Sequence, residues 1–319
     1  LGVVLIGPDR ASLESQPTQN QDAYRAYLRG RDALSKIPTE PLAEEMFTRA
    51  IELDPEFGLA WAGLSRAHSW RFHGGDKSDK RRAAALSTAQ EALRLEPDSP
   101  EAHMAMGLYY YRCFRDYDRA LEQIERAAAG RPDDTDVLGW KATIFKRQGR
   151  YDEAIQLRER IMELDPMDDG SVRELGVTYR LMREYAKSVA AYDQAIAIAP
   201  DVASPHFLKA IIYFAWKGTT SEARASLEAM PSGAGEQGLA RDAWFWLEFY
   251  EGRYEEALAR AQAGPEMFAD QLTLNARASR SARCLEQLGR TAEANAAWKE
   301  AVELLEIEKQ RRPGDFRVH

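Results

Sequence analysis

The chain has 319 residues, of which 45% are hydrophobic and 29% are charged, a composition typical of a folded globular protein. This length exceeds what a single hydrophobic core usually supports, so we expect two domains or a quasi-linear array. The net charge of −8, from 43 basic and 51 acidic residues, argues against wrapping of nucleic acid along the whole chain, because phosphates require a basic footprint. The net charge does not argue against a local basic patch.

The apolar opening, Leu1–Gly7, is about a third of the length that a membrane span requires, and it lacks the flank and cleavage site of a signal peptide. We therefore expect residues 1–20 to be a linker or the tail of an upstream domain. Cys113 and Cys284 show no metal-ligand spacing, so we expect two free thiols in or near helix interiors. Free thiols favour a reducing compartment, which predicts a cytoplasmic location. A periplasmic location stays open if the parent protein has an upstream membrane span.

Prolines punctuate the first two thirds of the chain at a regular interval. They are Pro55, Pro97, Pro132, Pro166 and Pro200. The last two intervals, 132 to 166 and 166 to 200, are both 34 residues, and the interval from 55 to 97 is 42 residues. The longer interval predicts an inserted loop in that unit.

Within each interval, small and apolar residues recur four and three positions apart, as in Ala85, Ala89 and Ala92, which places them on one face of a helix. A glycine in the middle of the interval, such as Gly149 or Gly252, supplies the positive φ that ends the first helix of a pair. The pattern therefore predicts repeated helical hairpins that pack closely.

These motifs resemble the tetratricopeptide repeat (TPR), whose period is 34 residues. The resemblance implies an all-α fold, a right-handed superhelical solenoid of about eight antiparallel helix pairs over residues 21–319. The expected pairs are 21–56, 57–99, 100–134, 135–168, 169–202, 203–236, 237–268 and 269–312. The sixth and seventh units are degenerate, because Pro231–Gly235 interrupts one and Ala263–Pro265 closes the other early. Asp315–His319 look like the start of another first helix, so we expect the chain to end mid-repeat.

The segment Pro17–Arg31 is similar to the segment that leads into the TPR region of multidomain bacterial signalling regulators. In those regulators a winged-helix, nucleotide-cyclase or protein-kinase output domain lies upstream. The resemblance implies a sensory or docking arm.

The sequence contains no recognisable catalytic motif. His68, His103 and His206 occupy repeat signature positions and are expected in the core, whereas His73 lies beside Gly74-Gly75 in the expected inserted loop. The sequence contains no phosphate-binding glycine loop, nucleophile elbow or dinucleotide fingerprint. We therefore expect neither an enzyme nor a cofactor nor a metal site.

The TPR resemblance implies that first helices line a concave groove with positions two, five, nine, twelve and thirteen of each repeat. The groove candidates are Tyr111, Arg112, Lys146, Arg147, Arg173, Arg180, Phe207 and Phe214. Five of these are cations and the two phenylalanines form an apolar strip, so we hypothesise an acidic or C-terminal peptide ligand with a hydrophobic anchor. The alternative is solvated charges that pair with Glu174 or Glu184. The chaperone-type carboxylate clamp is absent, because Leu108, Thr143 and Val177 occupy the position where it needs asparagine.

Aromatic residues form a second candidate group. It contains Trp70, Phe72 and His73 of the insertion, Trp216, and Trp244–Trp246. We interpret the tryptophans as core residues and leave the insertion open. The expected partner is a protein or peptide, without nucleic acid and without membrane contact in this segment. Self-association through the solenoid ends as a homodimer, or sensing of a small ligand, are the alternatives.

Overall fold

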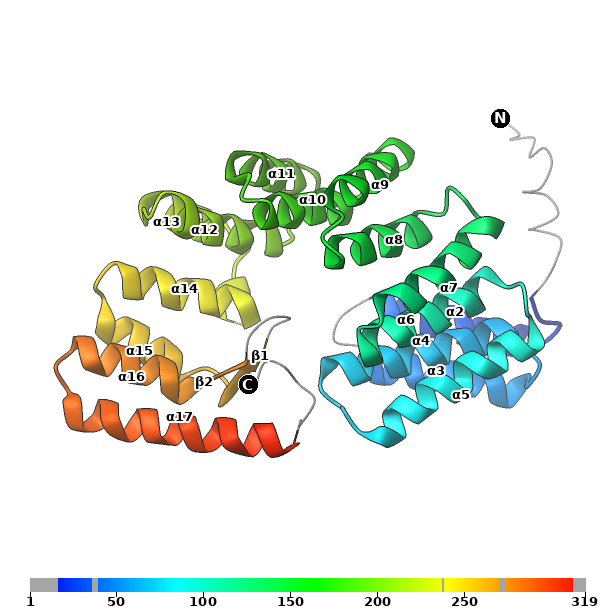
Figure 1. The fold of residues 1–319 in the computed structure, drawn as a ribbon, viewed down its shortest axis with the longest axis horizontal. Helices are drawn as coiled ribbons and strands as arrows, with labels where there is room; N and C mark the ends of the chain where they lie inside the picture. Colours follow the sequence, from blue (N-terminus) through cyan, green and yellow to red (C-terminus); the bar gives the residue numbers. More distant parts are fainter. Residues whose placement is uncertain (1–16, 36–39, 237, 270–273, 312–319) are drawn as a thin grey trace. The chain divides into compact units, whose positions relative to one another are not determined.

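The structure is a computed structural model that describes residues 17–35, 40–236, 238–269 and 274–311. The chain divides into two compact units, which join between Leu164 and Asp165. Helices make up nearly all of the regular structure in both units (Figure 1). We describe each unit by itself.

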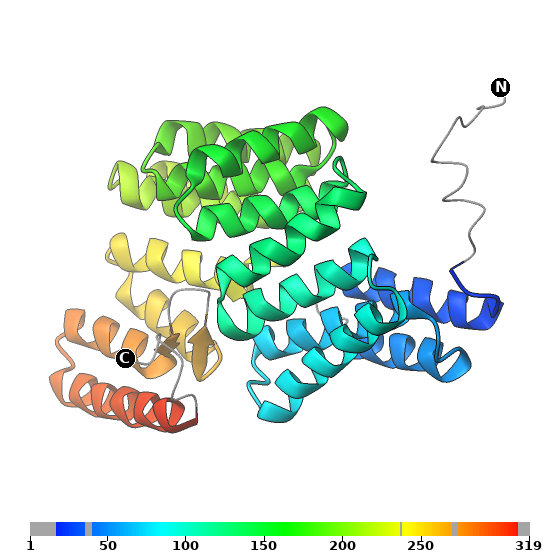
Figure 2. The same cartoon turned by 45° about the vertical axis from the view of Figure 1, so that its right-hand side comes forward.

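Unit 1 is a stack of helix pairs. Its elements are α2 (Gln21–Ser35), α3 (Glu40–Leu53), α4 (Gly58–Gly74), α5 (Asp79–Leu95), α6 (Pro100–Tyr109), the π-helix η1 (Tyr110–Phe114), α7 (Tyr117–Gly130), α8 (Thr135–Arg147) and α9 (Tyr151–Leu164). The pairs are α2–α3, α4–α5, α6–α7 and α8–α9, and each first helix also contacts an element of the preceding pair. Figure 2 shows the same stacking from a second direction.

Unit 2 repeats this plan. Its elements are α10 (Asp169–Leu181), α11 (Tyr185–Ile198), α12 (Ser204–Trp216), α13 (Ser221–Glu228), the 3₁₀ helix η2 (Ala234–Glu236), α14 (Gly238–Tyr250), α15 (Tyr254–Gln262), β1 (Met267–Ala269), β2 (Leu274–Ala276), α16 (Arg277–Gln287) and α17 (Thr291–Arg311). The pairs are α10–α11, α12–α13, α14–α15 and α16–α17. The described residues thus contain the eight helix pairs that the repeat pattern predicts.

The turns inside the pairs confirm the role of the mid-unit glycines. Gly149, Gly252 and Gly289 have φ values of 78°, 76° and 72°, in the left-handed region where glycine carries no Cβ strain. In the α10–α11 pair Arg183 occupies the corresponding turn with a φ of 61°, so an L-residue adopts the strained conformation there. At a helix start, the Ser99 hydroxyl accepts a hydrogen bond from the amide of Ala102.

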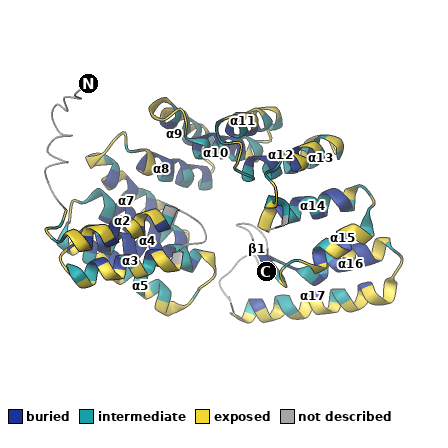
Figure 3. Cartoon of the chain, turned by 180° about the vertical axis from the view of Figure 1, so that it is seen from behind, coloured by how far each residue is buried: buried dark blue, intermediate teal, exposed yellow. Residues whose placement is uncertain are grey.

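In several hairpins an aromatic side chain of the second helix packs against a glycine of the first. In the α2–α3 pair a Cβ placed on Gly30 would lie 2.9 Å from the ring of Phe47, and in the α10–α11 pair one on Gly176 would lie 2.5 Å from the ring of Tyr192. The buried sides of the helices accordingly face their neighbours (Figure 3). His68, His103 and His206 are buried, as predicted for signature positions. Tight packing between small and large residues therefore builds the core.

Three details differ from the sequence predictions. Residues 267–269 and 274–276 form an antiparallel pair of short strands, with Phe268 opposite Asn275, so the first helix of the last pair begins only at Arg277. The insertion after Pro55 is taken up by longer helices, because α4 and α5 have 17 residues each, and α4 continues to Gly74 and includes Trp70, Phe72 and His73. Trp216 is 42% exposed, so its assignment to the core was wrong.

Two expectations fall wholly or mostly on residues that the structure does not describe. They are the linker or tail at 1–20, of which residues 1–16 lie outside the described ranges, and the further repeat start at Asp315–His319. Within the described ranges, every helix is too short or too polar to cross a membrane.

Candidate functional site

The candidate site in unit 1 centres on a π-helix. The helix α6 continues into η1, and the amide of Asp116 donates to the Tyr110 carbonyl with an N–O distance of 3.2 Å. The turn ends at Arg115, which has a left-handed φ of 57°. The wider turn changes the direction of the side chains that follow Tyr110, and single π-turns of this kind are frequent at functional sites.

Arg112, in the middle of this π-turn, lies between two tryptophans. Its guanidinium carbon is 4.4 Å from the centroid of the Trp70 ring and 4.9 Å from that of Trp140. Trp70 comes from α4 and Trp140 from α8, the first helices of the preceding and following pairs. The Arg112 side chain is thereby buried, with the residue 9% exposed. These cation–π contacts offset part of the cost of burying the charge.

The charge of Arg112 has few polar partners. Its Nη1 donates a long hydrogen bond of 3.4 Å to the Arg66 carbonyl, and its buried Nε has no hydrogen-bond partner in the described part of the chain. Asp136, the nearby carboxylate, pairs instead with Arg66 at 3.0 Å. Burial, and then repulsion from Arg66, lower the pKa of Arg112 to about 9, so the guanidinium is still protonated at pH 7. A buried cation without a counterion therefore lies at the centre of the site.

Arg147 adds a second cation to this group. Its Nε donates to the hydroxyl of Tyr111 at 3.2 Å, and the Tyr111 ring packs edge-on against Trp140 with the ring centroids 5.7 Å apart. Lys146, the residue before Arg147 in α8, is buried. Four residues predicted from the sequence thus belong to this part of unit 1. Two of them, Tyr111 and Arg147, are in direct contact.

His73 shows how positive the surroundings are. Its ring stacks on Trp70 with the centroids 6.0 Å apart. Burial, and then the charges of Arg112, Lys77, Arg115 and Arg147 in that order, together lower the pKa of His73 to about 4. The imidazole is therefore neutral at pH 7.

The other predicted groove residues belong to unit 2. Arg173 donates from Nη1 to the Ser204 hydroxyl at 3.0 Å, and the buried Nε of Arg180 has no hydrogen-bond partner among the described residues. Phe207 and Phe214 are partly buried against a core cluster that includes Ala210 and Leu247. Their rings thus serve packing within unit 2 as well as contributing apolar surface.

Two members of the unit 1 site were missed. Trp140 and Arg66 were not among the predicted residues, and Trp70 and His73 were placed in a loop. The sequence did contain one signal for these contacts. Trp70 and Trp140 occur in the first helices on either side of the helix that carries Arg112.

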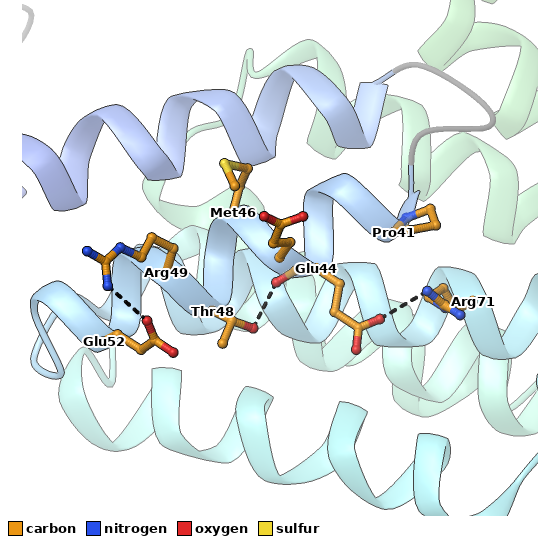
Figure 4. A pocket seen from close by; sticks show the side chains of 8 residues that line it. Pro41, Glu44, Met46, Thr48, Arg49, Glu52 and Arg71 are labelled. Carbon is orange, nitrogen blue, oxygen red and sulfur yellow. Dashed lines mark hydrogen bonds and ion pairs between the residues drawn. The ribbon is translucent and has the colours of Figure 1, made fainter.

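A shallow depression of about 660 Å³ over α3 is a different feature (Figure 4). Its carboxylate Glu44 pairs with Arg71 at 3.4 Å and with Arg81 at 2.9 Å, and Arg49 pairs with Glu52 at 3.1 Å. Most of the charged side chains at this surface are therefore paired with one another. The described residues also contain no group of three or more side chains suited to hold a metal ion.

Comparisons with known proteins agree with the repeat pattern. Sequence models of the tetratricopeptide repeat family match residues 114–175 and 174–202. The chain is 26% identical over 171 residues to anaphase-promoting complex subunit 3 of Schizosaccharomyces pombe, covering 54% of this chain and 24% of that protein. It is 24% identical over 202 residues to protein FlbA of Caulobacter vibrioides, covering 63% of this chain and 32% of that protein. The chain thus spans about a quarter to a third of the length of these curated relatives.

Solved structures show the same fold at low identity. A human IFIT1 dimer with m7Gppp-AAAA has a TM-score of 0.62 at 17% identity, covering 88% of this chain and 72% of that chain. PilW, described as a widely conserved type IV pilus biogenesis factor, has a TM-score of 0.56 at 16% identity, covering 70% of this chain and 99% of that chain. The Cut9–Hcn1 hetero-tetramer of APC/C has a TM-score of 0.51 at 18% identity, covering 70% of this chain and 45% of that chain. The chain therefore carries tetratricopeptide repeats and has the all-α fold of TPR solenoids.

Proposed function

We propose that this TPR scaffold binds a partner protein through an acidic or C-terminal peptide with a hydrophobic anchor, and that it catalyses no reaction. The observation that carries the proposal is the buried, protonated Arg112 between Trp70 and Trp140, without a counterion in the described part of the chain. An anionic partner would supply the missing counterion and remove part of the electrostatic cost of burial.

Local and overall charge have opposite signs, which supports a specific anion site. The chain carries a net charge of −8, yet four cations depress the pKa of His73. A positive patch on an acidic protein attracts an anionic segment locally while the rest of the surface repels it, and this contrast favours a defined binding position. Exposed surfaces of Trp70, Trp140 and Tyr111 add aromatic area of the kind enriched in protein interfaces.

Unit 2 carries predicted groove residues of its own. Arg173 and Arg180 would contact carboxylates of a bound peptide there, and Phe207 and Phe214 would provide apolar surface for a hydrophobic anchor. Support comes from the buried Arg180 Nε, which like that of Arg112 has no hydrogen-bond partner in the described ranges.

The biological setting belongs to the proposal as well. Anaphase-promoting complex subunit 3 and the Cut9–Hcn1 tetramer are parts of a protein assembly, which supports a role in protein binding. The similarity of Pro17–Arg31 to segments preceding TPR regions supports a sensory or docking arm of a bacterial regulator. The free thiols Cys113 and Cys284 support a cytoplasmic location.

A peptide array with graded acidity tests the proposal. Acidic peptides should bind the wild-type chain, and binding should weaken for Arg147→Glu and for the double variant Arg173→Glu/Arg180→Glu. Arg126→Glu is the matched control, because Arg126 is an exposed cation on the second helix α7. Circular dichroism should show the same helix content for all variants. Unchanged binding in both charge-reversal variants would refute the proposed groove.

Self-association is a second candidate function, favoured by the exposed apolar residues on α17. Val302 is 59% exposed and Ile307 is 44% exposed. Sedimentation at several concentrations tests it: a dimer that is lost in Val302→Glu/Ile307→Glu would support self-association. A monomer at all concentrations would exclude it.

A further inference from the structure

The guanidinium of Arg112 is enclosed in a way that restricts how a ligand reaches it. Trp70 and Trp140 come from the first helices on either side of α6, and the guanidinium carbon lies over both rings. A guanidinium donates hydrogen bonds only through N–H groups that lie in its own plane. A ligand must therefore approach along the plane of the guanidinium.

One edge of this plane has a hydrogen-bond partner and another does not. Nη1 donates to the Arg66 carbonyl, whereas Nε is buried and has no hydrogen-bond partner in the described chain. Nε and Nη2 together form a fork whose two parallel N–H bonds match the two oxygens of a carboxylate. The carboxylate nearest to this group, Asp136, is held by Arg66 at 3.0 Å.

We propose that the Nε–Nη2 edge of Arg112 is a carboxylate-binding subsite, which takes one carboxylate of the partner peptide in a bidentate pair beside the two indole rings once the side chains that cover Nε move aside. The inference rests on the proposed function and assigns the contact that gives it specificity.

The two rings favour a carboxylate over a phosphate. A carboxylate is flat, so in a bidentate pair both of its oxygens lie in the guanidinium plane. The oxygens of a phosphate are tetrahedral, and at least one of them would point out of that plane. The faces of the two indole rings beside the guanidinium carry negative quadrupole charge, which repels an anionic oxygen near them.

Nuclear magnetic resonance of the arginine side chains of the whole ¹⁵N-labelled chain tests the subsite directly. The probes are N-acetylated, C-amidated hexaglutamate, a hexa-alanine peptide with a free C-terminal carboxylate, and inorganic phosphate. Hexaglutamate or the free C-terminus should shift the Nε–Hε signal of Arg112 downfield in a saturable manner, and the response of the two peptides distinguishes a side-chain carboxylate from a terminal one. The Nε–Hε signal of Arg126 should not respond.

The variant Arg112→Lys keeps the positive charge but lacks the fork. It should weaken binding of the responding peptide about tenfold, as expected for loss of a charge-assisted bidentate pair. Arg126→Lys is the matched control and should leave the affinity unchanged. Thermal unfolding of both variants shows whether the fold is retained, and the signal from the wild-type chain decides the question if Arg112→Lys is unfolded.

The outcomes separate the subsite from the function. If an acidic peptide binds while the Arg112 signal stays in place, the subsite is refuted and the scaffold proposal stands. If phosphate alone shifts the signal, the carboxylate assignment is refuted. If neither peptide binds the chain at all, both the subsite and the acidic-peptide proposal are refuted.

Discussion

Replacing Gly176 with alanine should lower the free energy of unfolding, although alanine is the better helix former. A Cβ at Gly176 in α10 would lie 2.5, 2.8 and 2.9 Å from three ring atoms of Tyr192, and Tyr192 is 0% exposed. The ring is enclosed on all sides and has no room to withdraw. Overpacking of this kind costs about 1–3 kcal/mol, whereas the helix propensity of alanine returns about 1 kcal/mol. We expect a net loss of about 1–2 kcal/mol.

Gly74, the last residue of α4, is the matched control. A Cβ there would meet no atom within 4 Å. Gly74→Ala should therefore leave the free energy of unfolding unchanged or raise it by up to about 1 kcal/mol. Urea unfolding followed by circular dichroism measures both variants. If the Gly176→Ala variant were as stable as wild type, the close packing of glycine on tyrosine would not be a stability determinant.

Three further predictions concern charge and backbone strain. The folded pKa of His73, about 4, lies below the unfolded value near 6.5, so the contribution of neutral His73 to stability is complete above pH 6.5 and is lost as the pH falls toward 4. Urea unfolding should show that the free energy of unfolding is about 1–2 kcal/mol lower at pH 5 than at pH 7, and that His73→Gln reduces this loss. An equal loss in that variant would contradict the assignment. Arg112→Met should change the free energy of unfolding by less than about 1 kcal/mol. In the same assay Arg260→Met, which leaves the buried Glu248 carboxylate without this arginine, should lower it by about 3 kcal/mol. Equal losses would show that Arg112 acts as a structural ion pair. Arg183→Gly should raise the free energy of unfolding by about 0.5–1 kcal/mol, because it removes the strain of a left-handed φ. A decrease in the free energy of unfolding would refute that explanation.

The repeat architecture follows from local features of the sequence, and this explains why it was predicted well. Prolines that end each unit and glycines such as Gly149 and Gly289 act on the backbone at their own positions, so their spacing gives the helix pairs directly. The strands at 267–276 were missed because the only local signal there was Gly264-Pro265, which marks a break in the helix but does not predict a strand after it. The continuation of α4 to Gly74 was missed because the glycine pair at 74–75 was interpreted as part of a loop.

The candidate site depends on contacts between helices, which the sequence specifies less directly. Tyr111, Arg112 and Arg147 were predicted because they occupy groove positions within their own repeats. The position of Arg112 between Trp70 and Trp140 arises only when three successive first helices stack, and the π-turn at 110–114 adds a rotation that a regular helical period does not contain. Whether a predicted cation is solvated or buried was therefore decided by neighbouring repeats.

The position of a bound acidic peptide tests the central claim most directly. A hexaglutamate peptide that carries a photoreactive group at one end can be cross-linked to the whole chain, and mass spectrometry then identifies the modified segments. We predict cross-links in unit 1 on α4, η1 and α8, near Trp70, Arg112 and Arg147, and a loss of these products in excess unlabelled peptide. Cross-links confined to the second helices α3, α5 and α7 would contradict the claim that the first helices bind the partner.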